Sequence, residues 1–199
     1  QVRQVAAVHK SLPPAEILEL LNSHEHEVRL CALIILVNRY KRSKSEVERS
    51  ELFALYLSSV REGHVNNWDL IDTSAPYLGQ WWFDRADASD ALAELASHAG
   101  LWHRRAAVLF TFWFIRAGRY DVTLRLCEQL LGDKHDLIHK ATGWMLREVG
   151  NRNVEVLRDF LREHAAVMPR TMLRYAIEKL DPAERGEWMS KAPRKTQRP

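Results

Sequence analysis

The stretch DLIHKATGWMLREVG, residues 136–150, carries apolar residues at intervals of three and four together with two cations and a tryptophan. Such spacing predicts an amphipathic helix. Lys140, Trp144 and Arg147 fall on one face of that helix because they are four and three residues apart. A face turned toward the core would not normally carry cations at both ends. The sequence therefore predicts a helix whose Lys140, Trp144 and Arg147 stripe is open to solvent.

Similar stretches recur along the chain, each with a basic residue early and small or apolar residues after it. They are HEVRLCALIILVNRY (26–40), LWHRRAAVLFTFWFI (101–115) and PRTMLRYAIEKL (169–180). Anchor residues chosen in the successive units are separated by 39, 36, 36 and 34 residues. These anchors are Arg29, Trp68, Arg104, Lys140 and Arg174. A period of about 35 to 45 residues with two helices per unit is typical of HEAT-like repeats.

We therefore predict an all-α fold, an α-solenoid of HEAT-like helix pairs that is curved and has a basic concave face. The chain has 199 residues, of which 46% are hydrophobic and 28% charged, an ordinary composition for a soluble protein. We expect residues 1–190 to form a single repeat domain. The segment KAPRKTQRP, residues 191–199, lacks an apolar pattern and is expected to be a basic, disordered tail.

Several protein classes receive no support from the sequence. No apolar run approaches the length of a membrane span and no signal peptide is evident, so we expect a cytoplasmic protein without membrane contact. Cys31 and Cys127 lie in apolar helical patterns and are expected to be reduced core thiols. The nine histidines show no metal-ligand spacing, and glycine-rich phosphate-binding motifs are absent. We expect no metal, no cofactor and no bound nucleotide.

The stretch VNNWDLIDTSAPYLG, residues 65–79, places Trp68 and Asp72 on one face of a helix because they are four residues apart. Asn66 or Asn67 is suited to cap the start of that helix. Two interpretations remain open. An indole beside a carboxylate on the concave face could form the floor of a binding pocket. Alternatively, the tryptophan belongs to the core and Asp69 or Asp72 only complements the helix dipole.

Cations accompany the tryptophans in successive repeats. Arg104 and Arg105 are adjacent and project about 100° apart, so at least one points away from the core. Cations interleaved with aromatic faces suit the phosphates and bases of nucleic acid. The predicted DNA-binding residues are Arg39, Lys41, Arg104, Lys140, Arg147, Arg170 and Arg174. Acidic residues fall in the other helix of each pair, which reconciles a basic face with a net charge of only +3. The alternative is that these cations merely keep the face soluble.

Four ordered blocks resemble the AlkD-like DNA alkylation repair glycosylases, which are built from HEAT-like repeats. The blocks are NNWDLID (66–72), LWHRRAAVL (101–109), HKATGWMLREVG (139–150) and MPRTMLRYAIEKL (168–180). The resemblance implies that Asp72 is the catalytic carboxylate and that Trp68 and Trp144 are the active-site tryptophans. It also implies that Arg105 acts at the catalytic site and contacts DNA, and that Arg147 contacts the DNA backbone.

The resemblance covers residues 28–180 and implies a substrate, double-stranded DNA carrying cationic purines alkylated at N3 or N7. It further implies a glycosylase that works without enclosing a flipped base, and a monomer is the default expectation for this shape. No lysine is placed as an obvious Schiff-base nucleophile, so we expect a monofunctional glycosylase. The chain opens at QVRQVAAVHK, and we expect the first helices of the family to be missing. A catalytically silent relative that binds DNA, or a scaffold that binds a protein, is the alternative.

Overall fold

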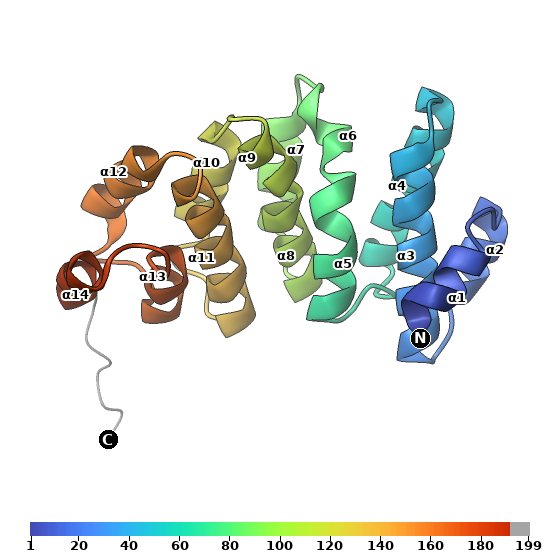
Figure 1. Ribbon diagram of the computed structural model, residues 1–199, viewed down its shortest axis with the longest axis horizontal. Coiled ribbons are helices and arrows are strands. Elements are labelled where there is room, and N and C mark those ends of the chain that lie inside the picture. The colour runs from blue at the N-terminus through green and yellow to red at the C-terminus, as the bar shows by residue number, and fades with distance from the viewer. Residues whose placement is uncertain (192–199) are drawn as a thin grey trace.

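A computed structural model describes residues 1–191, which form helices joined by short connections (Figure 1). The described part of the chain contains helices and no strand, as the sequence predicts. The helices are α1 (Val2–Val8), α2 (Pro14–Leu21), α3 (His26–Arg42), α4 (Glu46–Arg61), α5 (Trp68–Leu78), α6 (Gln80–Phe83), α7 (Ala88–Ala96), α8 (Leu101–Phe110), α9 (Phe112–Arg116), α10 (Asp121–Gln129), α11 (Asp136–Gly150), α12 (Val154–His164), α13 (Arg170–Ala176) and α14 (Pro182–Lys191).

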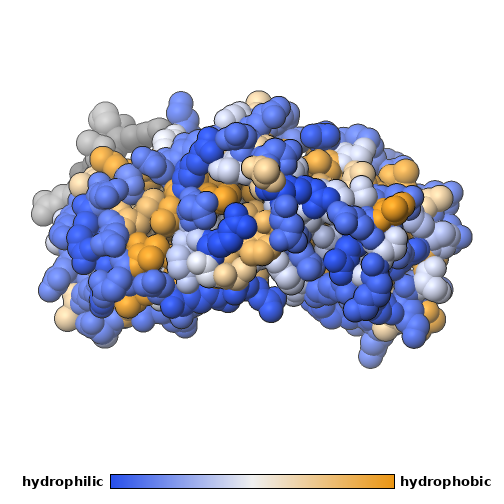
Figure 2. Space-filling model, turned by 90° about the horizontal axis from the view of Figure 1, so that it is seen from above, coloured by the Kyte–Doolittle hydropathy of each residue, from blue (hydrophilic) through white to orange (hydrophobic). Residues whose placement is uncertain are grey.

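The helices stack in two layers along one row, from α1 and α2 at one end to α12, α13 and α14 at the other (Figure 1). We call α3, α5, α8, α11 and α13 the inner layer; each of them contacts the next. The outer helices pack behind it, α2 and α4 on α3, α7 on α8, and α10 and α12 on α11. Seen from above, the molecule has an arched outline, and most of the visible surface is hydrophilic (Figure 2). The predicted α-solenoid of helix pairs is confirmed.

A glycine sets the distance between two neighbouring inner helices. Gly79 follows α5, and a Cβ atom added to it would lie 2.0 Å from the carbonyl oxygen of Phe110, at the end of α8. Only a residue without a side chain permits this approach of two backbones. The buried Pro76 lies one turn earlier in α5. This junction holds α5 against α8, the pair of helices that carries Asp72 and Arg105.

The buried apolar side chains form two clusters along the row. The first extends from α1 to α11, and the second covers the C-terminal helices from α10 to α14. Cys127 is buried in the second cluster, where burial raises the pKa of its thiol, while Cys31 is half-buried; both are free. Cys127 is thus a core thiol, as predicted, whereas Cys31 lies at the edge of the core.

The C-terminal boundary differs by one residue from the prediction. Lys191 belongs to α14, and its Nζ atom lies 4.0 Å from the centroid of the Trp188 ring. The rest of the predicted tail, residues 192–199, lies outside the described residues. Among residues 1–191, no helix combines the length and the apolar character that crossing a bilayer requires.

Candidate functional site

The helix that carries Trp68 and Asp72 begins where the sequence predicts. Asn67 is its N-cap, and the Asn67 side chain accepts a hydrogen bond of 2.8 Å from the backbone N–H of Trp68. A cap of this kind satisfies one of the unpaired N–H groups of the first turn. The helix then places Asp72 in its second turn, on the face turned toward α8.

Asp72 accepts two hydrogen bonds from a buried guanidinium. Arg105 in α8 donates from Nε to Asp72 Oδ1 at 2.8 Å and from Nη2 to Asp72 Oδ2 at 2.7 Å. Its remaining nitrogen, Nη1, donates to the backbone oxygen of Leu137 in α11 at 2.6 Å. Arg105 is only 4% exposed, so these partners replace its hydration. The arginine thereby joins three consecutive inner helices at the carboxylate.

Asp72 and Arg105 lie at the base of a hollow of about 330 Å³, which we call the cleft. Its walls come from α5, α8, α11 and α13. The lining residues are Trp68, Asp72, Arg105, Leu137, Lys140, Trp144, Arg147 and Tyr175. All four predicted catalytic residues therefore line one cleft, although they are separated by up to 76 residues along the chain.

Trp68 is 53% exposed, which excludes the interpretation of this tryptophan as a core residue. Asp69, next to it, takes the local structural role instead. Its Oδ1 accepts from the backbone N–H of Leu70 at 2.9 Å, and its Oδ2 lies 2.7 Å from Nε2 of His26. An indole this exposed leaves much of its ring available to a ligand.

A closed circuit of side-chain contacts fixes the second tryptophan, Trp144. The indole Nε1–H of Trp144 donates to Glu148 at 3.2 Å, and Arg152 donates to the other oxygen of Glu148, also at 3.2 Å. The Arg152 guanidinium lies 5.9 Å from the centroid of the Phe112 ring, and that ring lies 6.3 Å from the Trp144 ring. Trp144 is thus fixed in orientation from both its polar and its apolar side.

The two cations of the α11 stripe lie in the cleft but have carboxylate neighbours. Lys140 pairs with Asp136 at 2.8 Å; this hydrogen bond raises the pKa of Lys140 and lowers the pKa of Asp136. Arg147 pairs with Glu178 in the segment after α13 and lies 3.9 Å from Glu148. Both pairs are partly exposed, so they are weak and open to exchange for another anion.

Two of the predicted DNA-binding arginines have partners within the protein. Arg104 pairs with Asp133 at 2.7 Å, and its Nη1 donates to the backbone oxygens of His98 and Ala99 before α8. Arg39 binds Glu48 and the backbone oxygen of Leu12 at 2.5 Å. Neither arginine lines the cleft.

The position of Arg104 is a repeated structural feature of the inner layer. Arg29 donates to the backbone oxygen six residues before it, at Ser23, and Arg104 does the same to His98. In α11 the equivalent contact is made by His139 to the oxygen of Asp133, at 2.6 Å. The true counterpart of Arg29 and Arg104 is therefore His139, one residue before the expected anchor at Lys140. In α3, α8 and α11, the early basic residue holds the loop before the helix in place through this hydrogen bond.

The remaining predicted cations lie outside the cleft. Lys41 lines a second hollow of about 210 Å³ on the other side of α5, which shares Trp68 and Asp72 with the cleft. Arg170 and Arg174 belong to α13, where Arg174 is exposed, but it is the next residue, Tyr175, that lines the cleft.

Tyr175 lines the cleft although it was not predicted from the sequence. Gly143 allows α13 to approach α11 so closely that a Cβ atom at position 143 would lie 2.6 Å from Cβ of Tyr175. Gly143 directly precedes Trp144 in the recognised block, so a small residue there was a visible signal of a close neighbour. The identity of that neighbour depends on the packing of α13 and is not encoded in the local spacing.

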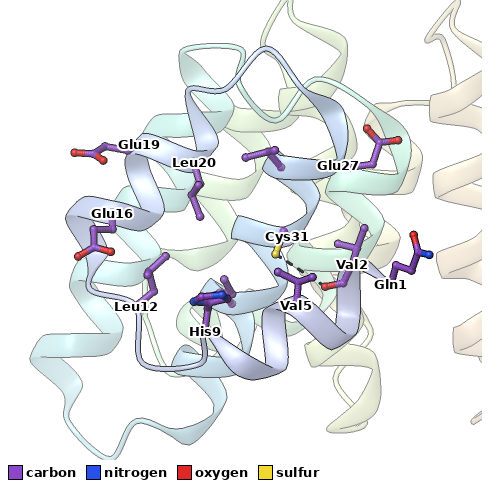
Figure 3. A pocket seen from close by; sticks show the side chains of 12 residues that line it. Gln1, Val2, Val5, His9, Leu12, Glu16, Glu19, Leu20, Glu27 and Cys31 are labelled. Atoms are coloured by element: carbon purple, nitrogen blue, oxygen red, sulfur yellow. Dashed lines mark hydrogen bonds between the residues drawn. The ribbon is translucent and has the colours of Figure 1, made fainter.

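A larger, apolar hollow of about 660 Å³ lies at the other end of the row, between α1, α2 and α3 (Figure 3). Val5, Leu12, Leu20 and Cys31 point into it, and the carboxylates of Glu16, Glu19 and Glu27 stand at its rim (Figure 3). Carboxylates repel phosphodiester groups. This hollow therefore differs in chemistry from the cleft. Within residues 1–191, no group of three histidine, cysteine or acidic side chains is arranged to hold a metal ion.

Comparison with known proteins agrees with this architecture. The family model described as DNA alkylation repair enzyme matches residues 1–180. A predicted DNA alkylation repair enzyme from Enterococcus faecalis has a similar structure, with a TM-score of 0.68 at 17% identity, covering 90% of this chain and 82% of that one. The crystal structure of smu.31 from Streptococcus mutans UA159 is similar with a TM-score of 0.56 at 18% identity, covering 96% and 89% of the two chains. No curated protein matches.

Proposed function

Because this chain belongs to the DNA alkylation repair enzyme family, we propose that it is a DNA glycosylase. Its substrates are cationic purines alkylated at N3 or N7 in duplex DNA, and the reaction is hydrolysis of the N-glycosidic bond. One observation carries the proposal. A single carboxylate, Asp72, is held by a buried arginine in an open cleft that also contains Trp68 and Trp144.

The number of carboxylates matches this class of lesion. Cleavage of a glycosidic bond develops positive charge at the anomeric carbon of the sugar, and most sugar hydrolases use two carboxylates, one of them to protonate the leaving group. A purine alkylated at N3 or N7 is already cationic and leaves as a neutral base. One carboxylate near the sugar is then sufficient. Asp72 is the only carboxylate among the residues that line the described cleft.

Asp72 stabilises the sugar cation and orients the attacking water. A carboxylate has about four lone-pair positions, of which the Arg105 fork occupies two. The others remain free to accept a hydrogen bond from water. The sequence led us to expect that Arg105 acts at the catalytic site and contacts DNA. Because Arg105 is buried and faces Asp72 and Leu137, its proposed role is to position the carboxylate.

Trp68 and Trp144 supply ring faces near the same carboxylate. A cation over an indole face is stabilised by about 0.5 to 2 kcal/mol, and the attraction grows as the sugar gains charge. An interaction that is stronger in the transition state than in the ground state accelerates the reaction. The exposure of Trp68 and the fixed orientation of Trp144 suit this role.

The lysine in the cleft is unsuited to covalent catalysis. A Schiff-base lysine needs a free amine, and enzymes obtain it by lowering the lysine pKa. The hydrogen bond that Lys140 donates to Asp136 has the opposite effect, raising the pKa of Lys140 and keeping it protonated. We therefore assign a monofunctional glycosylase that leaves an abasic site without cutting the strand.

The test is release of free base from two duplexes, one carrying 7-methylguanine and the other uracil, by the wild-type protein. We expect release of 7-methylguanine only, because uracil is neutral and departs as an anion unless an acid protonates it. Release of uracil at a comparable rate would contradict the one-carboxylate chemistry. No release of any alkylated purine by a folded protein would favour the catalytically silent DNA-binding protein or the protein scaffold. Salt-dependent DNA affinity would separate these two.

A further inference from the structure

The second hollow contains cations that have no carboxylate partner. It lies between α1, α3 and α5, and Arg3 and Lys41 are its positively charged lining residues. Both side chains are exposed. Within the described residues, neither takes part in an ion pair or a side-chain hydrogen bond, in contrast to Lys140 and Arg147 in the cleft.

The carboxylates of the second hollow do not pair with these cations. Asp72 is held by Arg105, and Asp69 is bound to His26 and to a backbone N–H. The Nζ atom of Lys41 lies instead over the ring of Tyr77, 3.3 Å from its centroid. The ring face stabilises a cation but carries no net charge. The two cations of the described hollow thus have no direct anionic partner.

The two cations also act on each other. Burial, followed by the charges of Arg116 and Arg3, lowers the pKa of Lys41. Like charges that lie close together without an ion-pair partner disfavour each other's charged form. Such a cluster is relieved when an anion binds among its members.

The position of the cluster selects the anion. In the inner layer α5 lies between α3 and α8, so the second hollow and the cleft flank α5 and meet at Trp68 and Asp72. A DNA strand that presents a sugar to Asp72 continues past α5 in both directions. We propose that Arg3 and Lys41 form a subsite for one backbone phosphodiester of the strand that carries the lesion, on the α3 side of Asp72. This proposal rests on the proposed function.

The subsite has a consequence for the substrate. An alkylated nucleoside could reach Asp72 and the tryptophans but would leave the cation cluster empty. The enzyme is therefore expected to require a polymer with an intact phosphate at this position. The same contact places the sugar with respect to Asp72, since the strand is then held on both sides of α5.

The test compares Lys41→Met with Lys44→Met on undamaged duplex DNA. Lys44 is an exposed cation shortly after α3 and does not line the hollow. Removing one phosphate contact is expected to weaken DNA binding about tenfold near 0.1 M salt and to reduce the salt slope by about one. Lys44→Met should leave both values close to those of the wild type. Equal losses for the two variants would overturn the proposal.

A duplex scanned with single uncharged methylphosphonates locates the phosphate. At one position, neutralising the DNA should abolish the difference in affinity between wild type and Lys41→Met. A constant difference at every position would overturn the proposal, even if the protein releases 7-methylguanine. Sodium phosphate should weaken binding no more than sodium chloride at equal ionic strength; a specific effect of phosphate would show that the cluster binds the free anion instead. Because these are binding measurements, they are independent of whether the protein excises a base.

Discussion

Asp72 meets two requirements that oppose one another. In the proposed mechanism its charge must be available to a developing sugar cation, yet the carboxylate must be held in place within a partly buried cleft. The two hydrogen bonds from Arg105 hold the carboxylate in place. They also weaken its attraction for a sugar cation, because the positive guanidinium offsets part of the carboxylate's negative charge. Removing either partner leaves the other buried and unpaired, at a cost of about 3 to 5 kcal/mol. Changes at Asp72 or Arg105 must therefore be read together with stability.

Trp68 allows function to be separated from folding. Because it is 53% exposed, Trp68→Ala is expected to destabilise the protein by less than the roughly 3 to 5 kcal/mol lost when a buried tryptophan is replaced by alanine. The same change should slow excision of 7-methylguanine about tenfold or more, since it removes a cation–π contact of the transition state. Single-turnover excision and thermal unfolding on the same preparation check this. Unchanged excision would remove Trp68 from the active site.

Glu148 is predicted to act through Trp144. Glu148→Gln keeps an oxygen that can accept the indole N–H, whereas Glu148→Leu removes it. We expect a small decrease in the excision rate for the glutamine variant and a decrease of about tenfold for the leucine variant, with little change in DNA affinity. Excision rates and DNA dissociation constants measured for both variants test this. Equal rates for the two would show that the hydrogen bond does not position Trp144.

At the level of elements, the close approach of α5 to α8 depends on Gly79. Gly79→Ala would place a Cβ atom 2.0 Å from the Phe110 oxygen and should destabilise the protein by about 1 to 3 kcal/mol, the range for overpacking. Gly132→Ala is the matched control, because a Cβ atom there meets nothing within 4 Å. Chemical denaturation of both variants checks this prediction. Equal stability of the two would mean that the helix junction yields easily.

The last helix is attached by a pH-sensitive pair. Arg158 in α12 binds both oxygens of Glu184 in α14, at 2.8 and 2.9 Å, and this pair lowers the pKa of Glu184 from 4.5 to about 2. A carboxyl group whose pKa is lower in the folded state stabilises that state above its unfolded pKa. The contribution should therefore be full above about pH 4.5 and disappear as the pH falls to about 2. Thermal midpoints of wild type and Glu184→Gln should converge across this range; a constant difference would contradict the assignment.

For the whole molecule, the α-solenoid was predictable because apolar periodicity and the recurrence of helix pairs are properties of the chain itself. The grouping of Trp68, Asp72, Arg105 and Trp144 was accessible through the recognised motifs. Partners distant in sequence were not accessible. Of the adjacent residues Arg104 and Arg105, it is Arg105 that is buried. Its partner Asp72 lies 33 residues away, so no local pattern in the sequence reveals which of the two arginines is buried.

The cations of the inner helices fall into two groups that the sequence did not distinguish. The cations early in the inner helices, Arg29 and Arg104, close loops within the protein, whereas Lys41 near the end of α3 lacks a carboxylate partner in the described structure. A basic residue on a helix face has the same sequence signature in both roles. Only the carbonyl oxygens and acids around it distinguish a structural arginine from a cation available to DNA.

The most direct test of the proposed catalytic role of Asp72 is single-turnover release of 7-methylguanine from duplex DNA. The proteins compared are wild type, Asp72→Asn and Asp69→Asn, at a temperature where all three are folded. We predict that Asp72→Asn loses at least about 100-fold in rate, the scale of a lost electrostatic contact to the transition state, with DNA affinity largely retained. Asp69→Asn should react at nearly the wild-type rate, since Asp69 binds His26 and lies outside the cleft. Wild-type rates for Asp72→Asn, or equal losses for both variants, would contradict the claim that Asp72 is the catalytic carboxylate.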